Sequence, residues 1–350
     1  MSGNRVNSSL KAIGILMLLF LLLPKMVAAQ EVCTQKLRNA RNLYQEGKLE
    51  RIPDLLSACI KSGFSKEEKI EALRLITLSY LYNENETAAQ YTYLKLLLIN
   101  PEFEPNREAD PTELILLHES FDTAPKFFYG VNLGGAYNLV QVIEPTQSIN
   151  TALNVGNYAF SYTIGAGLFF QYPLTEKISV SSELNFHYRS LTLNKSPNNE
   201  ATGTAPTTIT EDQSWLELPL LLNYELPFTA FPLELAVGPS FHYLLNANVS
   251  SEGAGTNFNN TDFRTQRNQL NMSGLAGIRG NFKILGMGFL TVGVFYQHRF
   301  FDETLERSDT YTARQQRLVL ASGYQDGQFR GHAVWLKLGV KFPFYNPALK

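Results

Sequence analysis

The segment WLELPLLLNYEL, residues 215–226, has the alternating pattern of a β-strand. With a period of two, one face carries only Leu216, Leu218, Leu220, Leu222, Tyr224 and Leu226. The opposite face carries Glu217, Asn223 and Glu225 among its residues. A membrane-spanning helix needs ~20 apolar residues, and this segment is shorter than that. The pattern therefore predicts a strand whose apolar face contacts either a soluble core or lipid.

Residues 1–29 have the layout of a secretory signal peptide. Arg5 and Lys11 precede an apolar run from Ile13 to Leu23, and the small residues Ala28 and Ala29 follow it. An uncleaved membrane anchor is the alternative, but the apolar run is short for a span. After Ala29 no segment holds ~18 consecutive apolar residues. We therefore expect an exported chain that is soluble or enters a membrane as strands.

Charge and cysteine content narrow the classes of function. The chain has 30 basic and 32 acidic residues, a balance that gives no indication of nucleic-acid binding. Its two cysteines, Cys33 and Cys59, lie just beyond the predicted cleavage site, and an oxidising compartment favours a disulfide between them. Two cysteines do not make a zinc-site pattern, which needs four spaced ligands.

Residues 30–124 have helical periodicity and form the first predicted domain. A capping box, Ser65 with Glu68, opens a helix, and Pro101 ends the next one. Upstream, residues 33–47 and 52–63 form a similar pair of helices, each holding one of the cysteines. The sequence therefore predicts two antiparallel helical pairs, the first linked by the disulfide.

The two pairs repeat each other and resemble tetratricopeptide units. The residues that carry the resemblance are Ala40, Leu43, Tyr44, Gly47, Ala88, Ala89, Leu97, Asn100 and Pro101. A generic small helical bundle is the alternative. The resemblance implies that the first helix of each pair lines a concave surface, which makes Arg38, Arg41, Gln45 and Arg74 candidates for contact with a partner. The alternative for these four residues is a solvated helix face.

After Pro125 alternation replaces the helical stripe. The candidate strands lie near 127–142, 158–172, 178–192, 214–226, 231–247, 268–283, 288–303 and 329–343. Short links alternate with long polar links around 143–157, 193–213, 248–267 and 304–328, and residues 196–213 read as solvated surface. Outer-membrane barrels have short periplasmic turns and long extracellular loops. Residues 125–347 are therefore predicted to form an eight-stranded antiparallel transmembrane β-barrel.

A soluble barrel of the lipocalin kind is the alternative, with its apolar side chains inside. The loop asymmetry, the long strands and the aromatic residues at strand ends favour the membrane version. Its interior would then hold a charge network of Glu183, Arg189, Glu217, Glu234, Arg279, Arg299 and Lys337. We expect Arg189 to meet Glu217 at one level and Glu234 to meet Arg279 nearer the periplasm, because buried charges need partners. An ion path is the alternative to structural pairing.

The barrel region resembles the PorT-like outer-membrane barrel family of Bacteroidota. The resemblance covers residues 125–347 and is carried by WLELPLLLNYEL, by FFYGVNLGGAYN at 127–138 and by WLKLGVKFPF at 335–344. It implies an outer-membrane location. It also implies a role in envelope assembly or in protein secretion of the type IX kind.

The histidines raise the alternative of a lipid-acting enzyme. His187, His242, His298 and His332 all fall in predicted strands, and Ser240 could form a Ser–His pair near the outer rim. The sequence has no GxSxG elbow and no acidic residue spaced to orient the pair. It also has no phosphate loop, HExxH or CxxC motif. We therefore predict no catalytic, metal or cofactor site.

These observations predict an α+β multidomain protein of the outer membrane. A signal peptide, 1–29, precedes a periplasmic helical domain, 30–124, and a transmembrane barrel, 125–347. The expected partners are outer-membrane lipid and a periplasmic or outer-membrane protein, with no nucleic acid. The expected function is to anchor an interaction domain. A lipid-acting enzyme, and a barrel that binds an extracellular ligand through its long loops, are the alternatives.

Overall fold

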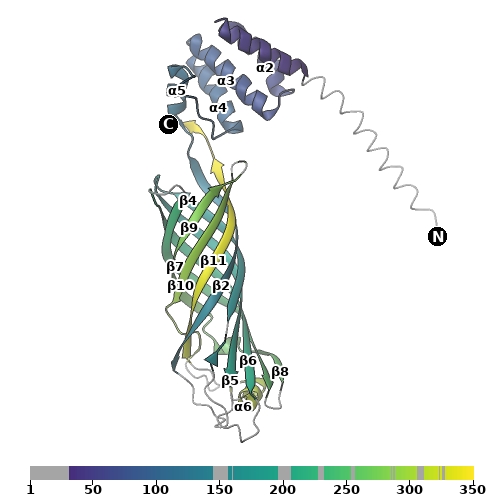
Figure 1. Ribbon diagram of the computed structural model, residues 1–350, viewed down its shortest axis with the longest axis vertical. Coiled ribbons are helices and arrows are strands. Elements are labelled where there is room, and N and C mark those ends of the chain that lie inside the picture. The colour runs from purple at the N-terminus through teal and green to yellow at the C-terminus, as the bar shows by residue number, and fades with distance from the viewer. Residues whose placement is uncertain are drawn as a thin grey trace, which may run out of the picture. The chain divides into compact units, whose positions relative to one another are not determined.

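The computed structural model describes residues 31–144, 157–159, 161–195, 206–227, 232–253, 257–284, 286, 288–305, 311–322, 324 and 328–350. The predicted signal peptide lies outside these residues. The chain divides into two compact units, which we call the helical unit (Met1–Ala124 with Tyr345–Lys350) and the barrel unit (Pro125–Phe344) (Figure 1). Residues 345–347, which we expected in the barrel, thus belong to the helical unit. No helix in the described part of the chain is both long and apolar enough to cross a membrane.

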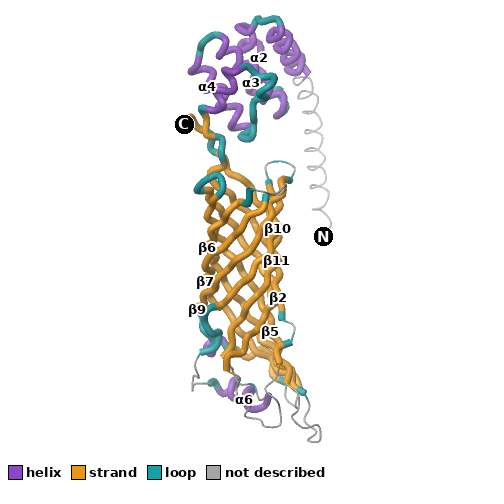
Figure 2. Tube along the Cα trace, turned by 60° about the vertical axis from the view of Figure 1, so that its left-hand side comes forward, coloured by secondary structure: helices purple, strands orange, loops and turns teal. Residues whose placement is uncertain are grey.

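The helical unit begins with a helix over residues 31–45. It continues with η1 (Leu49–Arg51), α2 (Ile52–Lys61), α3 (Lys66–Tyr82), α4 (Glu86–Ile99) and α5 (Thr112–Glu119) (Figure 2). The predicted capping box is confirmed, since the Ser65 side chain accepts from the Glu68 amide and the Glu68 side chain accepts from the Ser65 amide. The Asn85 side chain caps α4 by accepting from the amide of Ala88 (3.2 Å). Polar caps thus set the helix starts where the sequence places them.

Two apolar clusters hold these helices together. The first lies between helix 31–45, α2 and α3 and contains Leu37, Ala40, Ile52, Leu56, Leu75 and Ile76. The second lies between α3, α4 and α5 and contains Leu73, Tyr93, Leu96, Leu97 and Leu114. The predicted disulfide between Cys33 and Cys59 is present and joins helix 31–45 to α2. Helix α3 contributes to both clusters, so it is the central element of the unit.

The C-terminal residues complete the helical unit. Strand β1 (Phe121–Asp122) pairs antiparallel with β12 (Ala348–Leu349). The hydroxyl of Tyr345 donates to Glu102 Oε1 (2.8 Å), and Lys350 Nζ donates to the carbonyl of Glu119 (2.8 Å). The chain therefore leaves the helical unit for the barrel and returns to it.

The barrel unit is built from one sheet. Its strands are β2 (Pro125–Glu144), β3 (Asn157–Tyr158), β4 (Tyr162–Pro173), β5 (Ile178–Lys195), β6 (Thr207–Glu225), β7 (Leu233–Gly253), β8 (Phe258–Asp262), β9 (Leu270–Lys283), β10 (Phe289–Arg299) and β11 (Gln328–Tyr345). The order β5-β4-β2-β11-β10-β9-β7-β6 returns to β5 through a β5–β6 ladder, so the sheet closes into a barrel (Figure 2). Each expected range overlaps one of these long strands, whereas the short strands β3 and β8 were not predicted.

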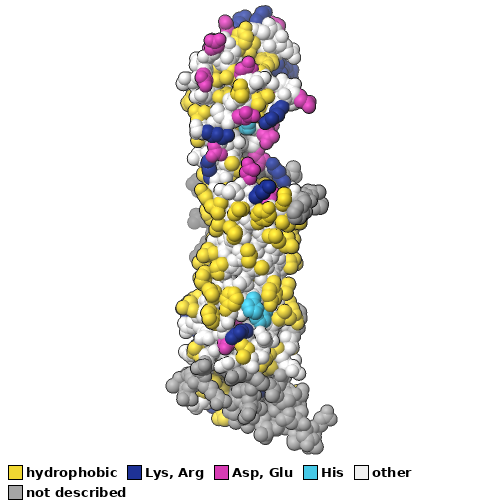
Figure 3. Space-filling model, turned by 90° about the vertical axis from the view of Figure 1, so that its left-hand side faces the viewer, with side chains coloured by type: hydrophobic (Ala, Val, Ile, Leu, Met, Phe, Trp, Pro, Cys, Tyr) yellow, Lys and Arg dark blue, Asp and Glu magenta, His cyan; other side chains and the backbone are white. Residues whose placement is uncertain are grey.

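The outer wall of the barrel is apolar and its interior is polar. In residues 215–225, which belong to β6, Leu222 is 51% exposed and Glu217 only 1% exposed. Hydrophobic side chains gather over the barrel strands in Figure 3. A soluble barrel has the opposite arrangement, with apolar side chains filling the inside. An apolar outer wall is what a bilayer-spanning barrel requires.

At the end of the barrel away from residues 125 and 344, the chain forms a folded lobe. This distal lobe consists of β8, α6 (Ala313–Ser322), Tyr324 and the adjoining ends of β5, β6 and β7 (Figure 1). Its apolar core contains Leu193, Ile209, Val249, Phe263, Leu318, Val319 and Tyr324. We expected solvated links here. That expectation is wrong for residues 207–213, which belong to β6, because they pair with β5 and β7 and Ile209 packs in this core.

We predict that the last residues stabilise the helical unit specifically. Deleting residues 346–350 removes β12 but leaves β11 whole, and it should lower the stability of the helical unit by about 1–2 kcal/mol because backbone pairs of β1 are lost. Helical circular dichroism during heating measures this change. A difference in migration on SDS gels between the unboiled and the boiled protein reports separately on the barrel. Lys350→Ala, which keeps β12, is the control, and an unchanged helical melting temperature in the deletion variant would contradict the prediction.

Candidate functional site

Buried charges fill the barrel interior in successive levels. At the level nearest the short turns, Glu183 accepts from Lys337 Nζ (2.7 Å) and from Arg279 Nη2 (3.1 Å). Glu234 accepts from Lys341 Nζ (3.2 Å), and its other oxygen lies 4.0 Å from Arg279 Nη1. Arg279 thus lies between two carboxylates. The expected proximity of Glu234 and Arg279 is present, and the two residues are direct partners in the β7–β9 ladder.

The next level centres on Glu217. Its Oε1 accepts from Ser240 Oγ (2.7 Å) and from Gln297 Nε2 (2.6 Å). His187 Nε2 lies 3.1 Å from Oε2, and His242 Nε2 lies 3.9 Å from Oε1. Polar side chains from three other strands, β5, β7 and β10, therefore surround one carboxylate, which offsets the cost of burying it.

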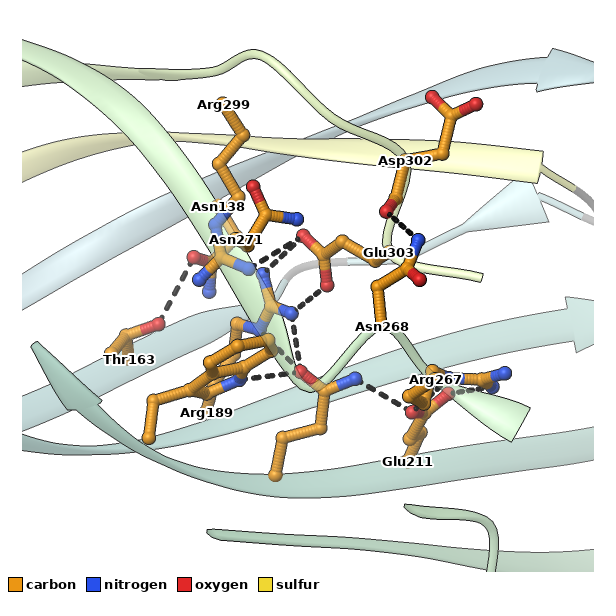
Figure 4. Close-up of polar contacts among 12 residues, drawn as sticks. Asn138, Thr163, Arg189, Glu211, Arg267, Asn268, Asn271, Arg299, Asp302 and Glu303 are labelled. Atoms are coloured by element: carbon orange, nitrogen blue, oxygen red, sulfur yellow. Dashed lines mark hydrogen bonds and ion pairs between the residues drawn. The ribbon is translucent and has the colours of Figure 1, made fainter. Parts of the chain in front are cut away.

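Toward the distal end, Glu303 is shared by two arginines (Figure 4). Arg189 donates to both oxygens of Glu303, through Nη1 at 2.9 Å and through Nη2, and Arg299 Nη1 lies 3.1 Å from Oε1. Arg189 Nε also donates to Gln213 Oε1 (3.1 Å), which accepts from Trp215 Nε1 (2.8 Å). The Arg299 guanidinium lies 4.4 Å from the Trp215 ring centroid, a distance at which the ring attracts the cation.

A last level continues the network into the distal lobe. Arg267 binds Glu211 in a bidentate manner, with Nε to Oε1 at 2.8 Å and Nη2 to Oε2 at 2.7 Å. The Tyr324 hydroxyl bridges the pair, accepting from Arg267 Nη2 (2.8 Å) and donating to Glu211 Oε2 (3.2 Å). Gln213 Nε2 donates to Glu211 Oε1 (2.6 Å) and so links this level to the level of Glu303. Polar contacts therefore run without a break from the barrel into the lobe.

The expected pairing of Arg189 with Glu217 is wrong. In the β5–β6 ladder Arg189 is opposite Gln213, while Glu217 is opposite Asn185. Four residues along β5 correspond to about 13 Å, too far for an ion pair. The ladder register, which the sequence did not reveal, separates the two residues.

Sequence reasoning also missed Glu211, Arg267 and Glu303, three members of the network. All three lie in segments that were read as solvated links or strand ends. The signal available for Glu211 was the alternation of residues 207–213, which continues the pattern of β6. Glu303 follows the end of β10 and carries no local signal.

Two small cavities lie among the described side chains of the interior. One cavity, beside Asn132, Glu183 and Arg279, holds about 10 Å³. Another, beside Asn138 and Arg299, also holds about 10 Å³. Each has room for about one water molecule. At these two levels the described side chains therefore form a filling rather than a passage.

The histidines do not assemble a catalytic group among the described residues. Ser240 donates to Glu217 instead of facing a histidine. His242 Nε2 lies 2.8 Å from Ser273 Oγ, but the same nitrogen faces Glu217, and its Nδ1 has no protein partner. A triad needs the acid at the other ring nitrogen. The rings of His298 and His332 stack on each other with their centroids 4.5 Å apart, and neither ring contacts Ser240 or His242. Within the described ranges no cluster of three metal-ligating side chains occurs.

The candidate partner residues of the helical unit differ in accessibility. Arg38 and Gln45 are exposed. Arg41 is exposed but pairs with Glu71 of α3 (2.5 Å), and this hydrogen bond raises the pKa of Arg41. The Arg74 side chain is only 24% exposed and pairs with Asp110. A partner that contacts the candidate residues needs them exposed, and Arg74 is mostly covered because the segment after α4 supplies a carboxylate that holds it.

A closed sheet with an apolar outer wall and a charged, filled interior defines a membrane-spanning β-barrel protein. A family model described as "Outer membrane protein beta-barrel domain" matches residues 120–318. The match covers more than half of the chain, and the protein belongs to this outer-membrane barrel family.

Several solved structures are similar to this chain. OprG from Pseudomonas aeruginosa is 10% identical, with a TM-score of 0.35 and coverage of 64% of this chain and 97% of that chain. AlkL in DMPC lipid bilayers is 12% identical, with a TM-score of 0.31 and coverage of 70% and 97%. Ail of Yersinia pestis is 10% identical, with a TM-score of 0.27 and coverage of 63% and 99%. No curated protein matches the sequence.

The shared carboxylate gives a quantitative prediction. Glu303→Gln leaves Arg189 and Arg299 without their common anion and should destabilise the barrel by roughly 3–5 kcal/mol. Adding Arg189→Met should recover part of that loss. Urea unfolding of the protein folded into lipid vesicles measures each variant.

The matched control combines Arg189→Met with Glu217→Gln. Because these two side chains do not meet, their effects should add to within about 0.5 kcal/mol. Coupling between Arg189 and Glu217, together with additivity between Arg189 and Glu303, would overturn the assignment of partners.

Proposed function

We propose that the protein is an outer-membrane anchor for a protein-interaction domain. The observation that carries the proposal is the filled interior, in which paired charges leave cavities of about one water molecule. A barrel filled in this way leaves no passage for a solute at these levels. Its role in this proposal is to hold the chain in the membrane. The helical unit is then the working part.

The proposal places the helical unit in the periplasm. The chain passes between the two units at residues 124–125 and 344–345, and both points belong to the barrel end with the short turns. In outer-membrane barrels the short turns face the periplasm. This topology supports a periplasmic helical unit.

The arrangement of helices supports the resemblance to tetratricopeptide units. Helix 31–45 and α2 form one pair, α3 and α4 form the next, and α3 packs in the apolar clusters of both. Stacked pairs of this kind use their first helices as a binding surface. Arg38 and Gln45 lie on such a helix and are exposed. The resemblance to the PorT-like family supports a partner in envelope assembly or type IX-like protein secretion.

A second candidate function is the binding of an extracellular ligand by the distal lobe. The observation in its favour is that β8 and α6 form a folded lobe with an apolar core of its own. A rigid lobe is a better binding surface than solvated loops because less ordering is needed on binding. We do not propose a lipid-acting enzyme, since the described serines and histidines form no catalytic group.

We predict that the exposed residues of helix 31–45 carry partner contacts. The variant Arg38→Glu with Gln45→Ala should reduce the yield of protein neighbours crosslinked in native membranes by about tenfold, the effect of losing ~1.4 kcal/mol at an interface. Lys61→Glu, on α2, makes the same charge change at an exposed position and is the control.

Both variants should reach the outer membrane and show heat-modifiable migration. If the Arg38 variant retains its neighbours at the control yield, helix 31–45 is not the binding surface. Loss of the same neighbours after deletion of residues 313–322 would instead favour the distal lobe.

A further inference from the structure

The outer wall of the barrel has an apolar groove near the distal end. It spans three adjacent strands and has a volume of about 380 Å³, within the range of small-molecule sites. Two rows of side chains line it, one formed by Leu216, Tyr243 and Leu270, the other by Leu218, Phe241 and Met272. The side chains of Glu217 and His242, which lie between the rows, are buried in the interior. The groove therefore presents apolar groups to whatever fills it.

On β6 the first row marks the edge of the apolar wall. Beyond Leu216, the same face of β6 continues with Ser214 and Asp212, and β9 begins only at Leu270. On β6 the groove thus ends where polar side chains begin. In a membrane barrel this transition lies at the level of the lipid head groups.

A positively charged side chain lies at this edge. Arg264, in η3 (Arg264–Gln266), donates from Nη2 to the hydroxyl of Tyr243 (3.0 Å), and its guanidinium lies 5.9 Å from that ring. Its Nε is buried and has no hydrogen-bond partner. Asp262 contacts the backbone amide of Arg264 (2.8 Å), and no carboxylate among the described residues forms an ion pair with the guanidinium. The guanidinium retains N–H donors for an anion.

We propose that this groove binds a phosphate-bearing lipid, with an acyl chain along the two apolar rows and the phosphate on Arg264. The groove is complementary to both parts of the ligand. The two apolar rows exclude water from the acyl chain, and the planar guanidinium suits the geometry of a phosphate. Tyr243 holds the guanidinium at the head of the groove while contributing its own ring to the wall. The inference rests on the barrel surface alone and is independent of the proposed function of the helical unit.

Native mass spectrometry of the full-length protein in detergent tests the site. The probes are phosphatidic acid, diacylglycerol with the same chains, and inorganic phosphate. We expect one phosphatidic acid to be retained, and Arg264→Gln to weaken its retention about tenfold, the effect of losing one charge-assisted interaction. Arg317→Gln, on α6, removes an exposed arginine outside the groove and should leave retention unchanged.

A second variant tests the apolar part without changing charge. Leu218→Trp adds bulk within the groove and should weaken the retention of phosphatidic acid and diacylglycerol alike. Equal retention by the wild type and the Arg264→Gln variant, or equal losses in the Arg264 and Arg317 variants, would overturn the proposal. Displacement of the lipid by inorganic phosphate at equal concentration would replace it with a site for free phosphate. Heat-modifiable migration verifies that each variant is folded.

Discussion

The pairing of the first long strand, β2, with the last, β11, is the contact on which the rest of the barrel depends. Every other ladder joins long strands that follow each other in the chain, and the β2–β11 ladder closes the sheet. Within a bilayer no water is present to satisfy free backbone groups, so a sheet can cross only when it has no open edge. Closure also divides the side chains of each strand into an outer and an inner set. The apolar wall and the charged interior both follow from it.

Closure makes the barrel interior narrow. Charged side chains inside it are shielded from water, so each of them needs a partner of opposite charge. A charge buried without a partner costs several kcal/mol. The observed solution is sharing: Glu183, Glu217 and Glu303 each contact donors from more than one strand. Such clusters contribute little net stability compared with apolar packing, but they penalise wrong registers, in which one charge would lose its partners. The same filling removes the space that a solute would need at these levels.

The two ends of the barrel unit are built differently. At one end, short turns join the strands and the chain passes to and from the helical unit. At the other end, strands β5, β6 and β7 extend further than the other strands. Strand β8 pairs with β7 there, and α6 packs against the inner side of the extended strands. Long strands without cover would leave unpaired edges and apolar faces open. The distal lobe is thus a structural consequence of strand length as well as a candidate surface for binding.

The sequence by itself determined the local elements of this protein. Alternation in residues 215–226 defined a strand, the Ser65 capping box started a helix, and the cysteine positions indicated the disulfide. These features depend on contacts between residues close in sequence or on composition. The loop asymmetry already predicted that the apolar faces point outward, as they do. Only the tertiary structure decided that Arg189 meets Glu303 instead of Glu217 and that residues 207–213 continue β6. The reason is physical: charge partners lie up to 154 residues apart in the chain, and strand register is likewise set by contacts between distant segments.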